Sequence, residues 1–172
     1  VVTRRVVQTA AGRSRRTTAL KLQTPRAEHV RLFVAIAVPE VVRSAMAKVQ
    51  LSFRDQLDGP EFKWARPDQF HLTLKFLGDV AAEPVPQLAA ALRLVVAAVK
   101  GLQIVSRGVG CFPDLQRPRV VWFGLSDPAG QLPLLQQRVA QAAAPFTAET
   151  KKESFVGHIT FCRIQSLKHS QK

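Results

Sequence analysis

The sequence is short of cysteine and of long apolar runs, and both shortages exclude classes of protein. Its two cysteines, Cys111 and Cys162, have neither a metal-binding spacing nor the pattern of a disulfide framework. We therefore expect a reducing compartment, the cytoplasm. The longest apolar helical stretch, residues 88–99, has about 12 residues and is broken by Arg93, so it is too short to cross a bilayer. We expect no contact with a membrane.

Acidic residues are also scarce. The chain has 12 Asp and Glu against 25 Lys and Arg, for a formal net charge of +13. Only part of this excess lies at the N-terminus, because 18 basic and 11 acidic residues follow residue 30. A basic domain favours a polyanionic partner such as RNA, although a solvated basic surface has the same composition. The few carboxylates form no metal-binding cluster, and we expect neither a metal nor a cofactor.

A short pattern occurs twice, with histidine and threonine two residues apart: His71-Leu72-Thr73 and His158-Ile159-Thr160. Alternate side chains of a strand point to opposite faces, so histidine and threonine share one face of each strand. In the first copy we expect Lys75 to join this polar row, and an apolar row of Phe70, Leu72, Leu74 and Phe76 to face the core. One copy alone would be a weak signal, whereas two copies on strand-like segments indicate a shared site.

The two ends of the chain differ in composition from the middle. Residues 1–30 are rich in Arg, Ser and Thr and lack an apolar face, which predicts a disordered basic tail. A mitochondrial transit peptide has a similar composition and is the alternative. Residues 31–163 are expected to form one domain of two lobes. Residues 164–172 are predicted to be a C-terminal tail.

Apolar periodicity predicts an α+β fold. The continuous apolar run at 32–38 is typical of a central strand, and residues 42–53 repeat at helical spacing. Further strands are expected at 63–65, 70–79, 102–109, 120–125 and around residue 158, and further helices at 88–99 and 132–142. Each His-x-Thr strand thus follows a strand and an amphipathic helix. We expect two pseudo-symmetric lobes of antiparallel sheet, with outer helices, around a central cleft that both motifs line.

Two histidines that face each other across a cleft suit acid–base catalysis. An unperturbed imidazole titrates near about pH 6.5, so one ring donates a proton while the other accepts one. The threonine hydroxyls can hold a phosphate oxygen between the two rings. A ribose 2′,3′-cyclic phosphate fits this arrangement, and its hydrolysis requires no metal.

The segments around the motifs resemble a known family. They are RLFVAIAVP at 31–39, FHLTLKFLGDV at 70–80, RPRVVWFGL at 117–125 and GHITFCR at 157–163. They resemble the 2H phosphoesterases, most closely the LigT-like bacterial and archaeal RNA 2′,3′-cyclic phosphodiesterases, also called 2′-5′ RNA ligases. The likeness covers about three quarters of the chain.

The resemblance implies a role for each motif residue. His71 would be the proton donor to the departing 3′-oxygen, and His158 the proton acceptor that activates water, leaving a 2′-phosphate. Thr73 and Thr160 would bind the phosphate. Arg163 is a weaker candidate for phosphate binding, because strict alternation places it opposite His158 and only a bulge would bring it round. Reversible 2′-5′ RNA ligation is a further activity that the resemblance implies.

The chain departs from the family pattern near its end. Gly157 stands where relatives usually have proline, and only nine residues follow Arg163 where relatives continue for some tens. We therefore expect a truncated second lobe without its edge strands. The predicted partner is an RNA or oligonucleotide that ends in a 2′,3′-cyclic phosphate, and the predicted state is a monomer. The alternative is a non-catalytic RNA-binding module with a degraded second lobe. Phe112 and Trp122 could stack on a base, but Trp122 lies in an apolar run and is expected in the core.

Overall fold

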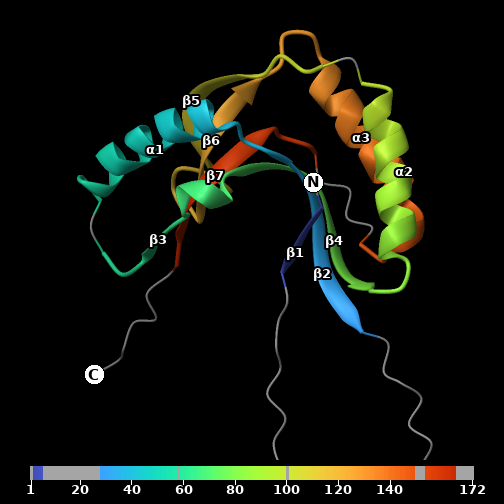
Figure 1. Cartoon of the computed structure of the whole chain (residues 1–172). Coiled ribbons are helices and arrows are strands. Elements are labelled where there is room, and N and C mark those ends of the chain that lie inside the picture. Colours follow the sequence, from blue (N-terminus) through green and yellow to red (C-terminus); the bar gives the residue numbers. More distant parts are fainter. Residues whose placement is uncertain (1, 6–27, 58, 100, 150–153, 166–172) are drawn as a thin grey trace, which may run out of the picture.

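The computed structural model describes residues 2–5, 28–57, 59–99, 101–149 and 154–165 (Figure 1). The strands are β1 (Val2–Arg5), β2 (His29–Ala37), β3 (Phe62–Trp64), β4 (His71–Ala81), β5 (Val105–Phe112), β6 (Val120–Ser126) and β7 (His158–Ile164). The helices are α1 (Glu40–Arg54), α2 (Val85–Ala97) and α3 (Gln131–Ala143), with short 3-10 turns η1 (Pro67–Gln69) and η2 (Ala144–Phe146).

The strands form two antiparallel sheets, which confirms the α+β fold. One sheet has the order β1-β2-β4 and the other β3-β7-β6-β5. The sheets repeat a unit: β1-β2-β4 corresponds to β5-β6-β7, with the motif strand paired in each case to the strand before a helix. In the described residues the second sheet has one strand more, because β3 pairs with β7. Each motif therefore begins a strand in an equivalent position of its sheet.

Two helices, α1 and α3, each follow a strand of one sheet but pack on the other sheet. α1 follows β2 but packs on the other sheet, where Phe53 contacts Phe161 of β7 with ring centroids 5.5 Å apart. α3 follows β6 but packs on β4, and the Gln136 side chain donates to the Leu74 carbonyl at 3.2 Å. α2 lies beside α3 on the same side of the molecule (Figure 1). This exchange joins the two repeats into one body.

Both motif strands turn their apolar side chains into a shared core. Leu72 of β4 and Phe161 of β7 are almost completely buried in one cluster, together with residues of all three helices. Phe123 of β6 stacks on Phe161 with centroids 4.3 Å apart, and Phe70 meets Phe123 edge-on. No helix among the described residues combines the length and the apolar character needed to span a bilayer.

The fold begins earlier than the composition predicts. Residues 2–5, placed in the tail by the sequence, form β1 and pair with residues 31–34 of β2. β2 begins at His29 rather than at Arg31, because β4 runs on to Ala81 and offers His29 a pairing partner. Residues 6–27 of the predicted N-terminal tail and 166–172 of the predicted C-terminal tail lie outside the described residues.

A buried glutamine fastens α1 to the second sheet. Gln50 is only 2% exposed, and its amide donates to the Ala65 carbonyl at 2.7 Å and to the Phe161 carbonyl at 2.9 Å. A buried polar side chain is tolerated where such hydrogen bonds replace its water. Gln50 therefore fixes α1 over the strand that carries the second motif.

We expect Gln50→Leu to lower the free energy of unfolding by about 1–3 kcal/mol, because the part-buried Ala65 carbonyl and the buried Phe161 carbonyl both lose the Gln50 amide as a donor. Urea denaturation measures the change. The matched control is Gln56→Leu, because Gln56 is exposed and its side-chain amide donates to the nearby Ser52 carbonyl of the same helix. Equal stability of the two variants would contradict the fastening role.

Candidate functional site

The two motif histidines have the same local geometry. Nδ1 of His71 lies 2.6 Å from the Gln69 carbonyl, and Nδ1 of His158 lies 2.7 Å from the Val156 carbonyl. A carbonyl oxygen only accepts, so Nδ1 carries the hydrogen in both rings. Nε2 is then left to accept a proton when the ring is neutral and to donate one when it is charged. Each ring is thus oriented by the backbone two residues before it.

The two motifs also share a β-bulge at the same place. In β4, Thr73 pairs with Ala35 but Lys75 pairs with Val34, so Leu74 is an extra residue. In β7 the same irregularity follows the threonine of the motif: Thr160 pairs with Trp122 and Cys162 with Val121, so Phe161 is extra. A bulge of this kind reverses the alternation of side chains beyond it. The residue three positions after each threonine therefore returns to the face of the histidine.

We call the face of each motif strand that carries histidine and threonine its open face. In β7 the bulge buries Phe161 and Cys162 in succession, and Arg163 after them is exposed. Arg163 therefore lies on the open face with His158 and Thr160. Strict alternation would put Arg163 on the opposite face, and the bulge in β7 is what brings it round.

In β4 the same reversal corrects the predicted rows. Phe76, expected in the apolar row, is 58% exposed and lies on the open face. Lys75, expected beside His71, points away and donates from Nζ to the Glu149 carbonyl at 3.3 Å. The two open faces therefore match at histidine and threonine and differ at the third position, which is Phe76 in one and Arg163 in the other.

Aromatic rings flank both histidines. The Phe33 ring lies 4.9 Å from that of His71 and 6.1 Å from that of Phe76, between centroids. The second histidine, His158, is 5.0 Å from Phe112 and 5.9 Å from Trp122. Both imidazoles are half-buried against these rings, which limit how far they can turn.

The expectation that Trp122 lies in the core is wrong. It is half-buried on the open face, opposite Thr160, while its neighbour Phe123 takes the core position. Gly110 faces the indole so closely that a Cβ there would lie 2.3 Å from Trp122 Cη2. The apolar run around Trp122 concealed this alternation in the sequence. The usable signal was Gly110, because a glycine inside a strand indicates that another group lies close to its backbone.

The motif strands are neighbours where the two sheets meet. β4 and β7 are in contact, and Figure 1 shows them side by side below α1. The histidines therefore belong to adjoining strands of different sheets. Among the residues that the structure describes, no three His, Cys, Asp or Glu side chains gather as metal ligands do.

Comparison with known proteins agrees with this architecture. The family described as "LigT like Phosphoesterase" matches residues 36–122, which include the first motif. A curated relative from Aquifex aeolicus, named RNA 2′,3′-cyclic phosphodiesterase, is 32% identical over 80% of this chain and 72% of its own length. A relative of the same name from Aeropyrum pernix is 34% identical over 64% of this chain and 62% of its own.

Solved structures show the same likeness. TT0787 of Thermus thermophilus superposes with a TM-score of 0.65 at 29% identity, over 80% of this chain and 75% of that one. Escherichia coli LigT in complex with 3′-AMP superposes with a TM-score of 0.60 at 30% identity, over 82% of this chain and 76% of that one. The chain thus spans about three quarters of these structures.

We expect Gly110→Ala to displace the indole of Trp122 and to lower the free energy of unfolding by about 1–3 kcal/mol, the range for overpacking. The clashing atoms all belong to the six-membered ring of the indole. Trp122→Phe removes that ring, so Gly110→Ala should cost much less in this background. A double-mutant cycle by urea denaturation measures the coupling, and additive effects would show that the two residues do not touch.

The bulge also sets a pH dependence. Burial raises the pKa of the Cys162 thiol from 9.0 to about 11, against a smaller opposing effect of a backbone hydrogen bond from Lys63. Below about pH 9 both folded and unfolded chains keep this proton. Between about pH 9 and 11 only the unfolded chain loses it, so stability must fall as the pH rises.

We expect the stability difference between the parent chain and Cys162→Ala to shrink by on the order of 2 kcal/mol as the pH rises from about 9 to 11. Urea denaturation at a series of pH values measures it. Cys111→Ala is the control, since it keeps the buried thiol. A stability difference between the two proteins that stays constant with pH would show that burial does not raise the pKa of the Cys162 thiol.

Proposed function

The chain belongs to the LigT-like phosphoesterase family, and from this premise we propose that it hydrolyses RNA 2′,3′-cyclic phosphate ends to 2′-phosphates. The observation that carries the proposal is the repeated geometry of the motifs, in which both rings present Nε2 while a carbonyl holds Nδ1. Relatives that bear the name RNA 2′,3′-cyclic phosphodiesterase support the substrate class.

In the proposed reaction the two histidines act on opposite sides of one phosphorus atom. Nε2 of neutral His158 takes a proton from water as the water oxygen bonds to phosphorus. Nε2–H of protonated His71 gives its proton to the 3′-oxygen as the bond from phosphorus to that oxygen breaks. The product is a 2′-phosphate with a free 3′-hydroxyl. Atoms and protons balance without a metal or a cofactor.

The other open-face residues hold the phosphate. The hydroxyls of Thr73 and Thr160 lie on the faces of the two histidines and donate to the phosphate oxygens. Arg163 adds a positive charge that stabilises the charge developing in the transition state. The bulge in β7 supports this role, because it turns the arginine to the side of His158.

The nucleoside of the substrate meets the aromatic side chains of the open faces. Phe76 is an exposed ring beside Phe33, and stacking on such rings holds bases without regard to their identity. Structures of Escherichia coli LigT with 3′-AMP and with phosphate support a ligand of this chemistry. Ligation of 2′-5′ ends, a cytoplasmic location and a monomeric state stay predictions.

The decisive experiment is an incubation with adenosine 2′,3′-cyclic phosphate, with the position of the product phosphate determined by ³¹P NMR. We expect 2′-AMP, in the presence of EDTA as in its absence. Salt-dependent RNA binding without any product would instead identify a non-catalytic RNA-binding module.

We expect His71→Ala and His158→Ala each to lower kcat by roughly 10²–10⁴, because each removes one proton transfer. The rate of the parent chain should be bell-shaped against pH, and each variant should lose one limb. His29→Ala is the matched control, since His29 begins β2 at the end opposite to the partner of His71. Parent-like turnover in either motif variant would refute the assignment.

A further inference from the structure

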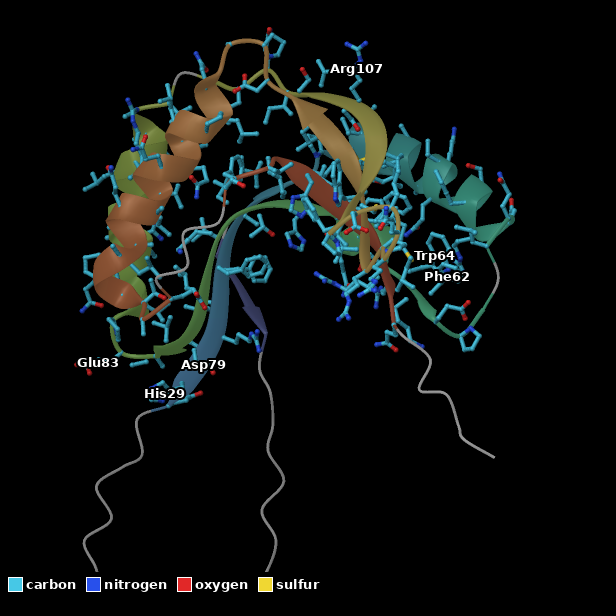
Figure 2. All side chains as sticks on the ribbon, turned by 180° about the vertical axis from the view of Figure 1, so that it is seen from behind. His29, Phe62, Trp64, Asp79, Glu83 and Arg107 are labelled. Carbon is cyan, nitrogen blue, oxygen red and sulfur yellow. The ribbon has the colours of Figure 1, made fainter. Side chains whose placement is uncertain are left out.

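The face of the second sheet that includes the open face of β7 holds a cation outside both motifs, Lys63 of β3. Lys63 lies directly opposite Arg163 in the antiparallel register of β3 and β7. Directly opposite residues of paired strands project from the same face of a sheet. The neighbours of Lys63 on β3, Phe62 and Trp64, project from the other face, where they line a hollow beneath α1 (Figure 2). Lys63 therefore extends the open face of β7 by one strand.

Lys63 and Arg163 are not neutralised by a carboxylate in the part of the chain that the structure describes. Both side chains are exposed, and neither forms a salt bridge there. The acids that flank Lys63 in the sequence are directed elsewhere. The Glu61 carboxylate lies against Gly59, and that of Asp68 is in a salt bridge with the arginine two residues before it. This end of the open face therefore carries unbalanced positive charge.

This pairing of cations suits an anionic ligand. Like charges at directly opposite positions of two strands, with Cβ atoms about 5 Å apart, repel each other and destabilise the sheet. A phosphate between the two charged groups removes that repulsion, because the guanidinium and the ammonium then each donate to a phosphate oxygen. The basic composition of the chain, with a net charge of +13, favours a polyanion such as RNA as this ligand.

The position of Lys63 indicates which phosphate of an RNA it meets. Arg163 follows Thr160 by three residues, at most about 10 Å of strand, so its long side chain can contact the reacting phosphate. Lys63 lies a further strand spacing, about 4.8 Å, to the side. A 2′,3′-cyclic phosphate is a diester with a single negative charge, which Arg163 already balances. Lys63 is therefore left for a second phosphate, and the nearest one in RNA is on the 5′-oxygen of the same nucleoside.

We propose that Lys63 determines specificity for RNA ends by binding the phosphate on the 5′-oxygen of the terminal nucleoside, with Arg163 between this phosphate and the reacting one. The inference rests on the proposed function for the identity of the reacting phosphate, but the binding of an RNA phosphate by Lys63 does not depend on turnover. An RNA end thus gains a contact that adenosine 2′,3′-cyclic phosphate lacks.

The kinetic test compares adenosine 2′,3′-cyclic phosphate with the same nucleotide carrying a methyl phosphodiester on its 5′-oxygen, which adds the second phosphate of RNA without a second base. We expect Lys63→Gln to lower kcat/KM about tenfold for the 5′-substituted substrate and to leave it within about twofold for the other. Lys63→Arg keeps the charge and should retain most of the preference. The control is Lys48→Gln, which removes the same charge from the exposed surface of α1. An unchanged preference in Lys63→Gln, an equal loss for both substrates, or the same loss in the control overturns the proposal.

A binding test separates this contact from catalysis. It uses a fluorescent 2′-O-methyl oligonucleotide whose 3′ end carries no cyclic phosphate, so turnover is not required. We expect the slope of log affinity against log salt to fall by about one in Lys63→Gln and to keep the parent value in Lys48→Gln. If the parent chain does not hydrolyse cyclic phosphates, this measurement still decides, since equal slopes for the parent and Lys63→Gln overturn the proposal.

The stability of the ligand-free protein distinguishes a binding role of Lys63 from a structural one. Because Lys63 and Arg163 repel each other, we expect Lys63→Gln to unfold at a urea concentration equal to or above that of the parent chain at low salt. A clear fall in the urea midpoint would show that an acidic partner holds Lys63 in the folded chain, and would overturn the proposal.

Discussion

The candidate site depends on one backbone irregularity, the extra residue that follows each motif threonine. Leu74 and Phe161 interrupt the pairing of β4 and β7 at equivalent points. Before the bulge, histidine and threonine lie on the open face and apolar side chains fill the core. After it, the alternation is reversed, so Phe76 and Arg163 return to the open face while Lys75 and Cys162 turn away. Without the bulge, strict alternation would turn Phe76 and Arg163 away from the histidine and threonine of their own strands.

The exchange of helices gives this arrangement its rigidity. The helix that follows β2 packs on the sheet of β7, and the helix that follows β6 packs on β4. Gln50 adds a specific link, since its amide donates to the carbonyl of Phe161 in β7 and to that of Ala65, the residue after β3. Neither repeat can bury its apolar face without the other, so the two motif strands keep a fixed relation to each other. Such positioning is what acid–base catalysis by two separate groups requires.

The sequence predicted the fold class, the order of the elements and the two motifs, because these depend on local periodicity. It did not predict the faces of Phe76 and Lys75, since a bulge leaves no mark in a regular apolar–polar alternation. Trp122 was misplaced for a related reason: in an apolar run, only pairing with Thr160 and the closeness of Gly110 show which face it occupies. The start of the domain also differed, because β1 pairs with β2 through backbone hydrogen bonds that composition does not reveal.

In the proposed reaction, the third open-face position bears on which oxygen of the cyclic phosphate leaves. Two identical half-sites related by a twofold axis would accept a cyclic phosphodiester in two equivalent orientations, which interchange its 2′ and 3′ oxygens. Phe76 on one side and Arg163 on the other make these orientations unequal in energy, since one side favours a flat apolar group and the other an anion. Two residues outside both His-x-Thr triplets would then decide which oxygen is cleaved from phosphorus. Through them, a site built from two similar halves would bind its substrate in one orientation.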